Sequence, residues 1–238
     1  MIQSVLFDLD GTLLPLDQQE FVKVYLNLLG RHVAPYADPK KFVGQLLSST
    51  GVMIANRDKV KTNKAVFYED FLPKIGVAEE VLAPALDLFY EQHFGQVRSV
   101  TQPSPAARQA VLAAIHAGCD VVVATNPIFP GNAVEQRLEW AGVADLDFKL
   151  ITSYENSCFC KPHPEYYLEI ADRIGRHPSE CLMIGNDVEE DLIAGIVGMK
   201  TYLVTDCLLN AKGLEARPDY SSALSEVAES LPGIIRGK

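Results

Sequence analysis

Several short apolar runs in this 238-residue sequence end in polar side chains that could carry out chemistry. Val5-Leu6-Phe7 leads into two carboxylates, and the run at 121–124 leads into a hydroxyl and an amide. Ligands of an open parallel sheet bind outside the carboxyl ends of its strands, so we expect these groups to converge at one edge. The candidate residues are Asp8, Asp10, Thr125, Asn126, Lys161, Asp187 and Asp191.

The acidic candidates Asp8, Asp10, Asp187 and Asp191 would share their site with one lysine, Lys161. Two like charges about 4 Å apart repel by roughly 1 kcal/mol in water and about 4 kcal/mol near a protein surface. Such a cluster needs either protonated carboxyl groups or a bound cation. Mg²⁺ prefers oxygen ligands and binds one or two carboxylates together with substrate phosphate and water. The charge of the cluster therefore predicts Mg²⁺ as the cofactor.

Four motifs along the chain resemble those of the haloacid dehalogenase superfamily in their order, spacing and strand context. The first is Asp8-Leu9-Asp10-Gly11-Thr12, and residues 121–126 (VVVATN) resemble the second. Cys160-Lys161-Pro162 resembles the third motif, and residues 185–191 (GNDVEED) resemble the fourth. The resemblance covers the whole chain, because a predicted helical segment follows the first strand where this superfamily carries its helical cap.

This resemblance implies a phosphatase that works through an aspartyl-phosphate intermediate. Asp8 would attack phosphorus as the nucleophile, and Asp10 would protonate the leaving oxygen and then activate water. Lys161 and Mg²⁺ would neutralise the phosphate. The Thr125 hydroxyl and Asn126 would hold phosphate oxygens. The implied metal ligands are Asp8, the backbone carbonyl of Asp10, Asp187, and Asp191 directly or through water.

The fourth motif departs from the usual pattern of the superfamily, in which an aspartate directly follows the glycine. Here Asn186 follows Gly185, and Asp187 comes next. The four-residue spacing from Asp187 to Asp191 is one that the superfamily allows. We therefore assign Asp187 to the metal, with Asn186 as the alternative ligand.

Hydrophobic spacing predicts a parallel sheet whose strands alternate with helices. Continuous apolar runs, typical of strands buried on both faces, predict strands near 3–8, 120–125, 148–152, 181–184 and 201–204. In the same part of the chain, one helix is predicted from 105 to about 118 and another ends near 141. A third begins at 164, a fourth ends near 198, and the last covers 222–231. Between residues 15 and 98 we expect helices alone, near 17–29, 40–49, 62–72 and 79–94.

This order of elements predicts an α/β fold with a parallel-sheet, Rossmann-like core and an inserted all-helical cap domain. The core would comprise residues 1–14 and 99–238, and the cap residues 15–98. A cap that closes over the cleft would exclude water during phosphoryl transfer and supply specificity. Lys61 and Asn63, which precede a predicted helix, either face the substrate across the cleft or belong to an exposed loop.

The composition argues against several classes of partner. There are 21 Lys and Arg against 31 Asp and Glu, a net charge of −10, and no basic run longer than Lys40-Lys41, so we expect no nucleic acid. No apolar run approaches the roughly 20 residues of a membrane span, and the N-terminus lacks a signal-peptide pattern. Five cysteines give no even disulfide framework, which fits a reducing cytoplasm. The oligomeric state stays open.

Two further features have a structural interpretation. Cys158, Cys160 and His163 lack the second ligand pair that structural zinc requires, and Lys161 among them would repel the metal. Trp140 is expected to pack in the core or between a helix and the sheet.

The predicted function is that of a Mg²⁺-dependent phosphatase acting on a small phosphorylated metabolite. A phosphomutase would share every core residue and differ in how the cap retains the phosphorylated intermediate. A dehalogenase would use Asp8 to attack carbon without Mg²⁺, and the further carboxylates Asp10, Asp187 and Asp191 count against it. A catalytically idle binding protein on the same fold is the remaining alternative, and the complete set of core groups counts against that.

Overall fold

The computed structural model describes residues 1–237 and contains a six-stranded parallel sheet in the order β3-β2-β1-β4-β5-β6. The first five strands lie where the apolar runs predicted them, which confirms the α/β fold class. The sixth was not predicted, because its residues Tyr-Ser-Ser lack an apolar run and it pairs only as an edge strand with β5. The strands are β1 (Ser4–Phe7), β2 (Asp120–Val123), β3 (Leu150–Ile151), β4 (Cys181–Gly185), β5 (Lys200–Val204) and β6 (Tyr220–Ser222).

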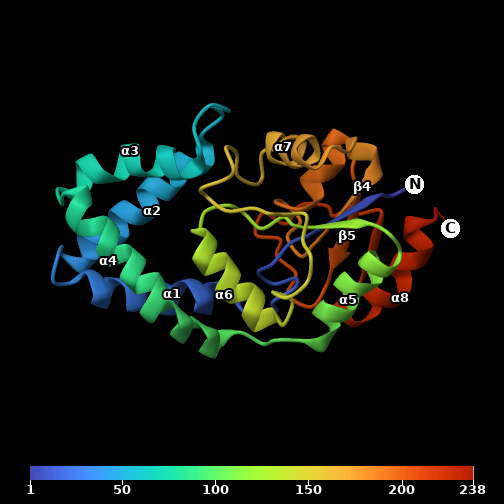
Figure 1. The fold of residues 1–238 in the computed structure, drawn as a ribbon, viewed down its shortest axis with the longest axis horizontal. Coiled ribbons are helices and arrows are strands. Elements are labelled where there is room, and N and C mark those ends of the chain that lie inside the picture. The colour runs from blue at the N-terminus through green and yellow to red at the C-terminus, as the bar shows by residue number, and fades with distance from the viewer. Residues whose placement is uncertain (238) are drawn as a thin grey trace.

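Four helices follow β1 along the chain and gather at one end of the molecule, away from the sheet (Figure 1). They are α1 (Gln18–Val33), α2 (Pro39–Ala55), α3 (Asn63–Ile75) and α4 (Glu79–Gln92), and we refer to residues 18–92 as the helical segment. Each of the first three begins at a side-chain cap: Asp17, Asp38 and Thr62 accept a bond from the backbone three residues on. Such caps fix where a helix begins.

Four more helices alternate with the strands: α5 (Pro105–His116), α6 (Gly131–Ala141), α7 (Pro164–Ile174) and α8 (Leu224–Ile235). Short 3-10 helices are η1 (Phe94–Val100), η2 (Pro178–Glu180) and η3 (Leu192–Val197). Between β4 and β5 the sequence predicted a full helix, but residues 186–191 form a turn and leave only η3 before Gly198. Among residues 1–237, no helix combines the length and apolar character that a membrane crossing requires.

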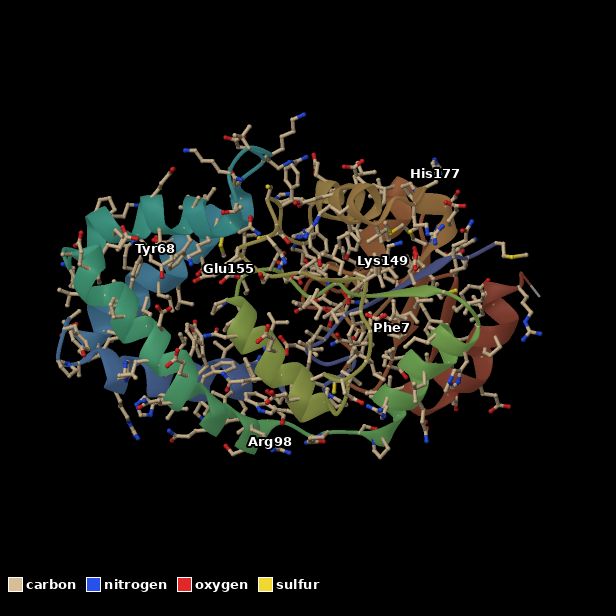
Figure 2. All side chains as sticks on the ribbon, in the orientation of Figure 1. Phe7, Tyr68, Arg98, Lys149, Glu155 and His177 are labelled. Carbon is tan, nitrogen blue, oxygen red and sulfur yellow. The ribbon has the colours of Figure 1, made fainter. Side chains whose placement is uncertain are left out.

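The sheet is buried on both faces, as its continuous apolar strands predicted. Val5, Phe7, Val121 and Ile184 pack into one hydrophobic cluster with residues of α5, α6 and α8. Alternate residues of the same strands, such as Leu6, belong to a second cluster formed with α7 and η3. The period of two along a strand explains this division. Figure 1 shows α5 beside α8 and α7 on the other side of the strands, and Figure 2 shows Phe7 among the strands.

A buried cluster of aromatic rings joins the helical segment to the α/β core. At its centre Phe94 of η1 is fully buried and stacks on Trp140 of α6, with ring centroids 5.4 Å apart. Phe94 also meets the rings of Phe21 and Tyr25 on α1. The expectation that Trp140 packs in the core is confirmed. Because these rings continue into the cluster on one face of the sheet, the two parts share one core.

Replacing Phe94 with alanine should lower the free energy of unfolding by about 3–5 kcal/mol, since it removes a buried ring at the junction. Urea unfolding followed by fluorescence of Trp140, the single tryptophan, measures this directly. Val60→Ala serves as the control, because Val60 is exposed and should change stability by less than about 0.5 kcal/mol. A loss below about 1 kcal/mol for Phe94→Ala would show that the junction contributes little.

Candidate active site

The sequence-predicted site residues converge at the carboxyl ends of the central strands. The strand order reverses at β1, whose neighbours are β2 and β4, and Asp8 directly follows it. Such switch points are where open α/β sheets bind ligands. A cavity of about 280 Å³ opens here, and its lining includes the predicted Asp8, Asp10, Thr125, Asn126, Asp187 and Asp191.

The seventh predicted residue, Lys161, lies behind the cavity wall rather than in it. Its side chain is almost fully buried, and its Nζ lies 2.7 Å from Asp8 Oδ1 and 2.6 Å from Asp191 Oδ1. Three segments distant in the sequence are thereby held together by one cation. Lys161 thus offsets one of the two negative charges, so its effect on a ligand in the cavity comes mainly through these carboxylates.

Burial controls the charges of this cluster. It raises the pKa of Asp8 to about 8, although Lys161 acts in the opposite direction. Burial also opposes the charge of Lys161, but the nearby Asp191 and Asp8 together raise the pKa of Lys161 well above its usual value. Lys161 therefore stays an ammonium, but its single positive charge does not balance the buried carboxyl groups around it.

Asp10 makes an ion pair with Arg137, a residue that the sequence reasoning missed. Arg137 is fully buried on α6, its Nε donates to the Ala133 carbonyl (3.0 Å), and its guanidinium lies 4.5 Å from the ring centre of Phe129. The pair engages Asp10 Oδ2, while Asp10 Oδ1 has no hydrogen-bond partner among the described residues. The only sequence signal was a charged residue on a helix expected to pack against the core.

Thr125 and Asn126 are held in place by hydrogen bonds from neighbouring side chains and backbone. The Thr125 carbonyl accepts bonds from Thr152 Oγ1 (2.8 Å) and the Tyr166 hydroxyl (2.8 Å). Asn126 Oδ1 accepts from the backbone N–H of Lys161 (3.2 Å), so the second and third motifs contact each other directly. These contacts fix the two residues at the cavity wall.

Glu190 lines the cavity and is a second residue of the site that the sequence reasoning missed. Its carboxylate accepts two bonds from Asn126 Nδ2, at 3.0 and 3.1 Å. Burial raises the pKa of Glu190 to about 7. Glu190 lies inside the fourth motif, but adjacency in sequence does not reveal which side chains of a turn point inward.

The two candidate metal ligands in the fourth motif, Asn186 and Asp187, have different surroundings. Asn186 is bonded at both ends: Oδ1 accepts from Thr12 Oγ1 (3.0 Å), and Nδ2 donates to the Cys207 carbonyl (2.6 Å). It also packs against Gly11, whose φ is +85° and where any Cβ would collide with Asn186. Asp187 Oδ1 accepts from the backbone N–H groups of Glu189 (2.7 Å) and Glu190 (3.0 Å). Asn186 thus joins two loops, and of these two candidate ligands Asp187 is the one with a negative charge to offer a metal ion.

The donor chemistry of the cavity fits a hard divalent cation. Five acidic side chains line it, no basic side chain of the described residues does, and burial raises the pKa of Asp187 as well as that of Asp8. Within residues 1–237, no three Asp, Glu, His or Cys side chains are already gathered into a metal cluster. Asp191 is engaged at both oxygens, by Lys161 and by the Asp187 backbone N–H (2.9 Å). The oxygens that could hold a cation therefore belong to Asp8, Asp187 and Asp10, whose Oδ1 has no hydrogen-bond partner among the described residues.

Neither of the two polar residues considered for substrate contact lines the cavity. Lys61 is exposed and pairs with Glu69 (2.7 Å). Asn63 is fully buried, where its Nδ2 donates to the carbonyls of Pro127 (3.2 Å) and Phe159 (3.3 Å). Asn63 therefore ties the start of α3 to two loops of the core.

Adding a methyl group at Gly185 should disrupt the cluster around Lys161. A Cβ there would overlap the Asp191 carboxylate and lie 2.7 Å from the Asp191 Cβ. We expect Gly185→Ala to lower the free energy of unfolding by about 1–3 kcal/mol, the usual effect of overpacking. Chemical denaturation measures it against Gly44→Ala, where α2 leaves open space. Equal stability of the two variants would contradict close packing at Gly185.

Comparison with known proteins gives the same family that the four motifs resemble. Residues 2–197 match the haloacid dehalogenase-like hydrolase family. The chain is 24% identical to the putative phosphatase YhcW of Bacillus subtilis (strain 168), over 96% of this chain and 94% of the relative. It is 23% identical to a phosphoglycolate phosphatase of Psychrobacter arcticus, over 97% of each chain.

A solved structure shares the fold over its full length. This is the L-2-haloacid dehalogenase from Xanthobacter autotrophicus, at a TM-score of 0.59 and 19% identity, covering 98% of this chain and 100% of that one. The family match spans most of the chain, including all four motifs up to Asp191. The protein therefore belongs to the haloacid dehalogenase-like hydrolase family.

Proposed function

We propose that this hydrolase is a Mg²⁺-dependent phosphatase that acts on a small phosphorylated metabolite through an aspartyl-phosphate at Asp8. The observation that carries the proposal is the position of Asp8, at the end of the central strand, in the cavity wall and fixed by Lys161 at 2.7 Å. The curated relatives named as phosphatases support the same reaction. A cavity of about 280 Å³ lies at the small end of the usual range for ligand sites.

In the first step a carboxylate oxygen of Asp8 attacks phosphorus, and the bond from phosphorus to the leaving oxygen breaks. Asp10 donates a proton to that oxygen, so the product leaves as a neutral alcohol. In the second step water attacks the aspartyl-phosphate, Asp10 accepts a proton from it, and inorganic phosphate leaves with Asp8 restored. Thr125 and Asn126 bind and orient the phosphoryl oxygens, which is the main work of such a site.

Mg²⁺, when bound, supplies charge neutralisation for the phosphoryl group. Asp8, Asp187 and the backbone carbonyl of Asp10 would hold it. Asp191 would act through water, because both of its oxygens are already engaged by the protein. Asp187 is preferred over Asn186, whose side chain is bonded at both ends.

The helical segment supplies the second part of the proposal. We assign residues 15–98 as a cap domain and residues 1–14 and 99–238 as the core, as the sequence predicted. A cap beside the cavity restricts substrates to small molecules and excludes water from the reacting groups. Gln18 at the start of α1 already lines the catalytic cavity. A cytoplasmic location is supported by the five cysteines, all of which are free thiols.

Asp8→Asn should abolish hydrolysis of p-nitrophenyl phosphate, with a loss of about 10³-fold or more, because the nucleophile is removed. Activity of the unaltered protein should require Mg²⁺ and disappear with EDTA. The matched control is Asp147→Asn, in an exposed second Asp-Leu-Asp run. Activity that survives both EDTA and Asp8→Asn would refute the proposal. Transfer of phosphate between substrate positions, with no inorganic phosphate released, would instead support a phosphomutase.

Arg137→Met should reduce kcat by about 10²- to 10⁴-fold with little change in KM, because Asp10 loses the partner that orients it for proton transfer. Arg137→Lys keeps a cation and should recover part of kcat. Thermal unfolding of both variants provides the control for folding. If kcat follows stability alone, and lysine gives no recovery, Arg137 only supports the fold.

A further inference from the structure

A second cavity, of about 120 Å³, lies within the helical segment beside the catalytic cavity. It is bounded by helices α1 to α4 and by two loops of the core, around Phe129 and Tyr154. We call it the apolar chamber. Tyr68 on α3, which lines it, and Glu155 of the core loop lie near each other where the helical segment meets the core (Figure 2).

The apolar chamber adjoins the catalytic cavity. Gln18, Ile128 and Phe129 line both spaces. Phe129 also covers the guanidinium of Arg137, which pairs with Asp10. A molecule with its phosphate at Thr125 and Asp8 would pass these three shared residues to reach the chamber.

The chemistry of the chamber is apolar and uncharged. None of the described residues that line it carries a charge, and most are aliphatic or aromatic, such as Phe21, Leu46 and Phe67. Tyr25 and Tyr90 satisfy each other through a bond between their hydroxyls (2.9 Å). Burial raises the pKa of Tyr25 to about 12, so this hydroxyl stays neutral. The chamber therefore presents mainly rings and methyl groups, and its described lining offers no charged partner for an anion.

Two cations contact rings of the chamber lining, and they do not alter this character. Arg137 lies beneath the Phe129 ring and is paired with Asp10. Lys64 is exposed and sits over the ring of Tyr154, 5.5 Å from its centre. A carboxylate or second phosphate in the chamber would lose its hydration without gaining a charged partner, which is unfavourable.

The volume of the chamber limits the size of an occupant. A dry apolar cavity of roughly 150 Å³ holds a benzene molecule in another protein, so a space of about 120 Å³ is close to the size of one ring. Edge-on contacts among Phe21, Tyr25 and Phe129 provide ring surfaces for it.

We propose that the apolar chamber binds the organic group of the substrate, and that the substrate is a phosphate monoester whose organic group is uncharged and aromatic. This inference rests on the phosphatase function proposed above and narrows its substrate class. It places the phosphate among the carboxylates and the ring beyond Phe129.

The test compares benzyl phosphate, ethyl phosphate and phosphoglycolate. All three are phosphates of primary alcohols, and they differ in whether the CH₂ group bears a phenyl ring, a methyl group or a carboxylate. We expect kcat/KM for benzyl phosphate to exceed each of the others by about 10- to 100-fold, the range for burying one large apolar group. Equal values, or a preference for phosphoglycolate, would overturn the inference while leaving the phosphatase function intact.

A variant pair tests the chamber itself. Leu46→Arg places a cation in the lining and should lower the ratio of benzyl phosphate to phosphoglycolate activity by at least about tenfold. Val52→Arg, at an exposed site on the same helix outside the lining, should leave the ratio unchanged. A ratio that moves equally in both variants, or in neither, would show that the chamber does not select the organic group.

Calorimetric titration of Asp8→Asn separates binding from turnover. Tighter binding of benzyl phosphate than of phosphoglycolate would support the chamber even if hydrolysis is slow. Absence of hydrolysis with all three esters, together with no Mg²⁺-dependent activity on p-nitrophenyl phosphate, would count against the proposed function. Equal binding of the two esters would count against the chamber.

Discussion

The buried ammonium of Lys161, set between Asp8 and Asp191, is the interaction on which the site depends. Removing a lysine and two carboxylates from water is costly, and this arrangement is stable only if the three groups meet in good geometry. The parallel sheet provides that geometry, because β1 and β4 are neighbours and their carboxyl ends carry Asp8 and the turn to Asp191. The third-motif loop then brings Lys161 between them. The surplus negative charge that remains is what the proposed Mg²⁺ would offset.

Arg137 and Phe129 couple this charged cluster to the helical segment. The guanidinium pairs with Asp10 on one side and lies beneath the Phe129 ring on the other. The same ring lines both the catalytic cavity and the apolar chamber. The position of the proposed proton donor and the shape of the space for the organic group therefore depend on the same pair of side chains. The aromatic cluster around Phe94 holds this arrangement against α1.

Three of the four motifs allowed much of the site to be predicted, because they fall at strand ends, where backbone topology alone determines the position, whereas the Lys161 motif lies in a loop before α7. Asp8 follows a run that could only be a buried strand, and Thr125 follows another. Arg137 and Glu190 escaped prediction for a different reason. A charged residue on a helix or in a turn is normally solvated, and only the packing of α6 and of the 186–191 turn points these two inward. The apolar chamber had no sequence signal, since its lining comes from four helices and two loops.

The sequence by itself determined the order of the first five strands and of most helices, the parallel sheet, the helical insertion and the identity of the polar groups at the strand ends. These follow from local hydrophobic periods and from short motifs, which act over a few residues. Only the tertiary structure decided that Lys161 faces two carboxylates from behind the cavity wall, that Asn186 joins two loops, and that an apolar chamber adjoins the site. Each of these depends on side chains from segments far apart in the chain. Their distances and burial are set by packing, which no local pattern encodes.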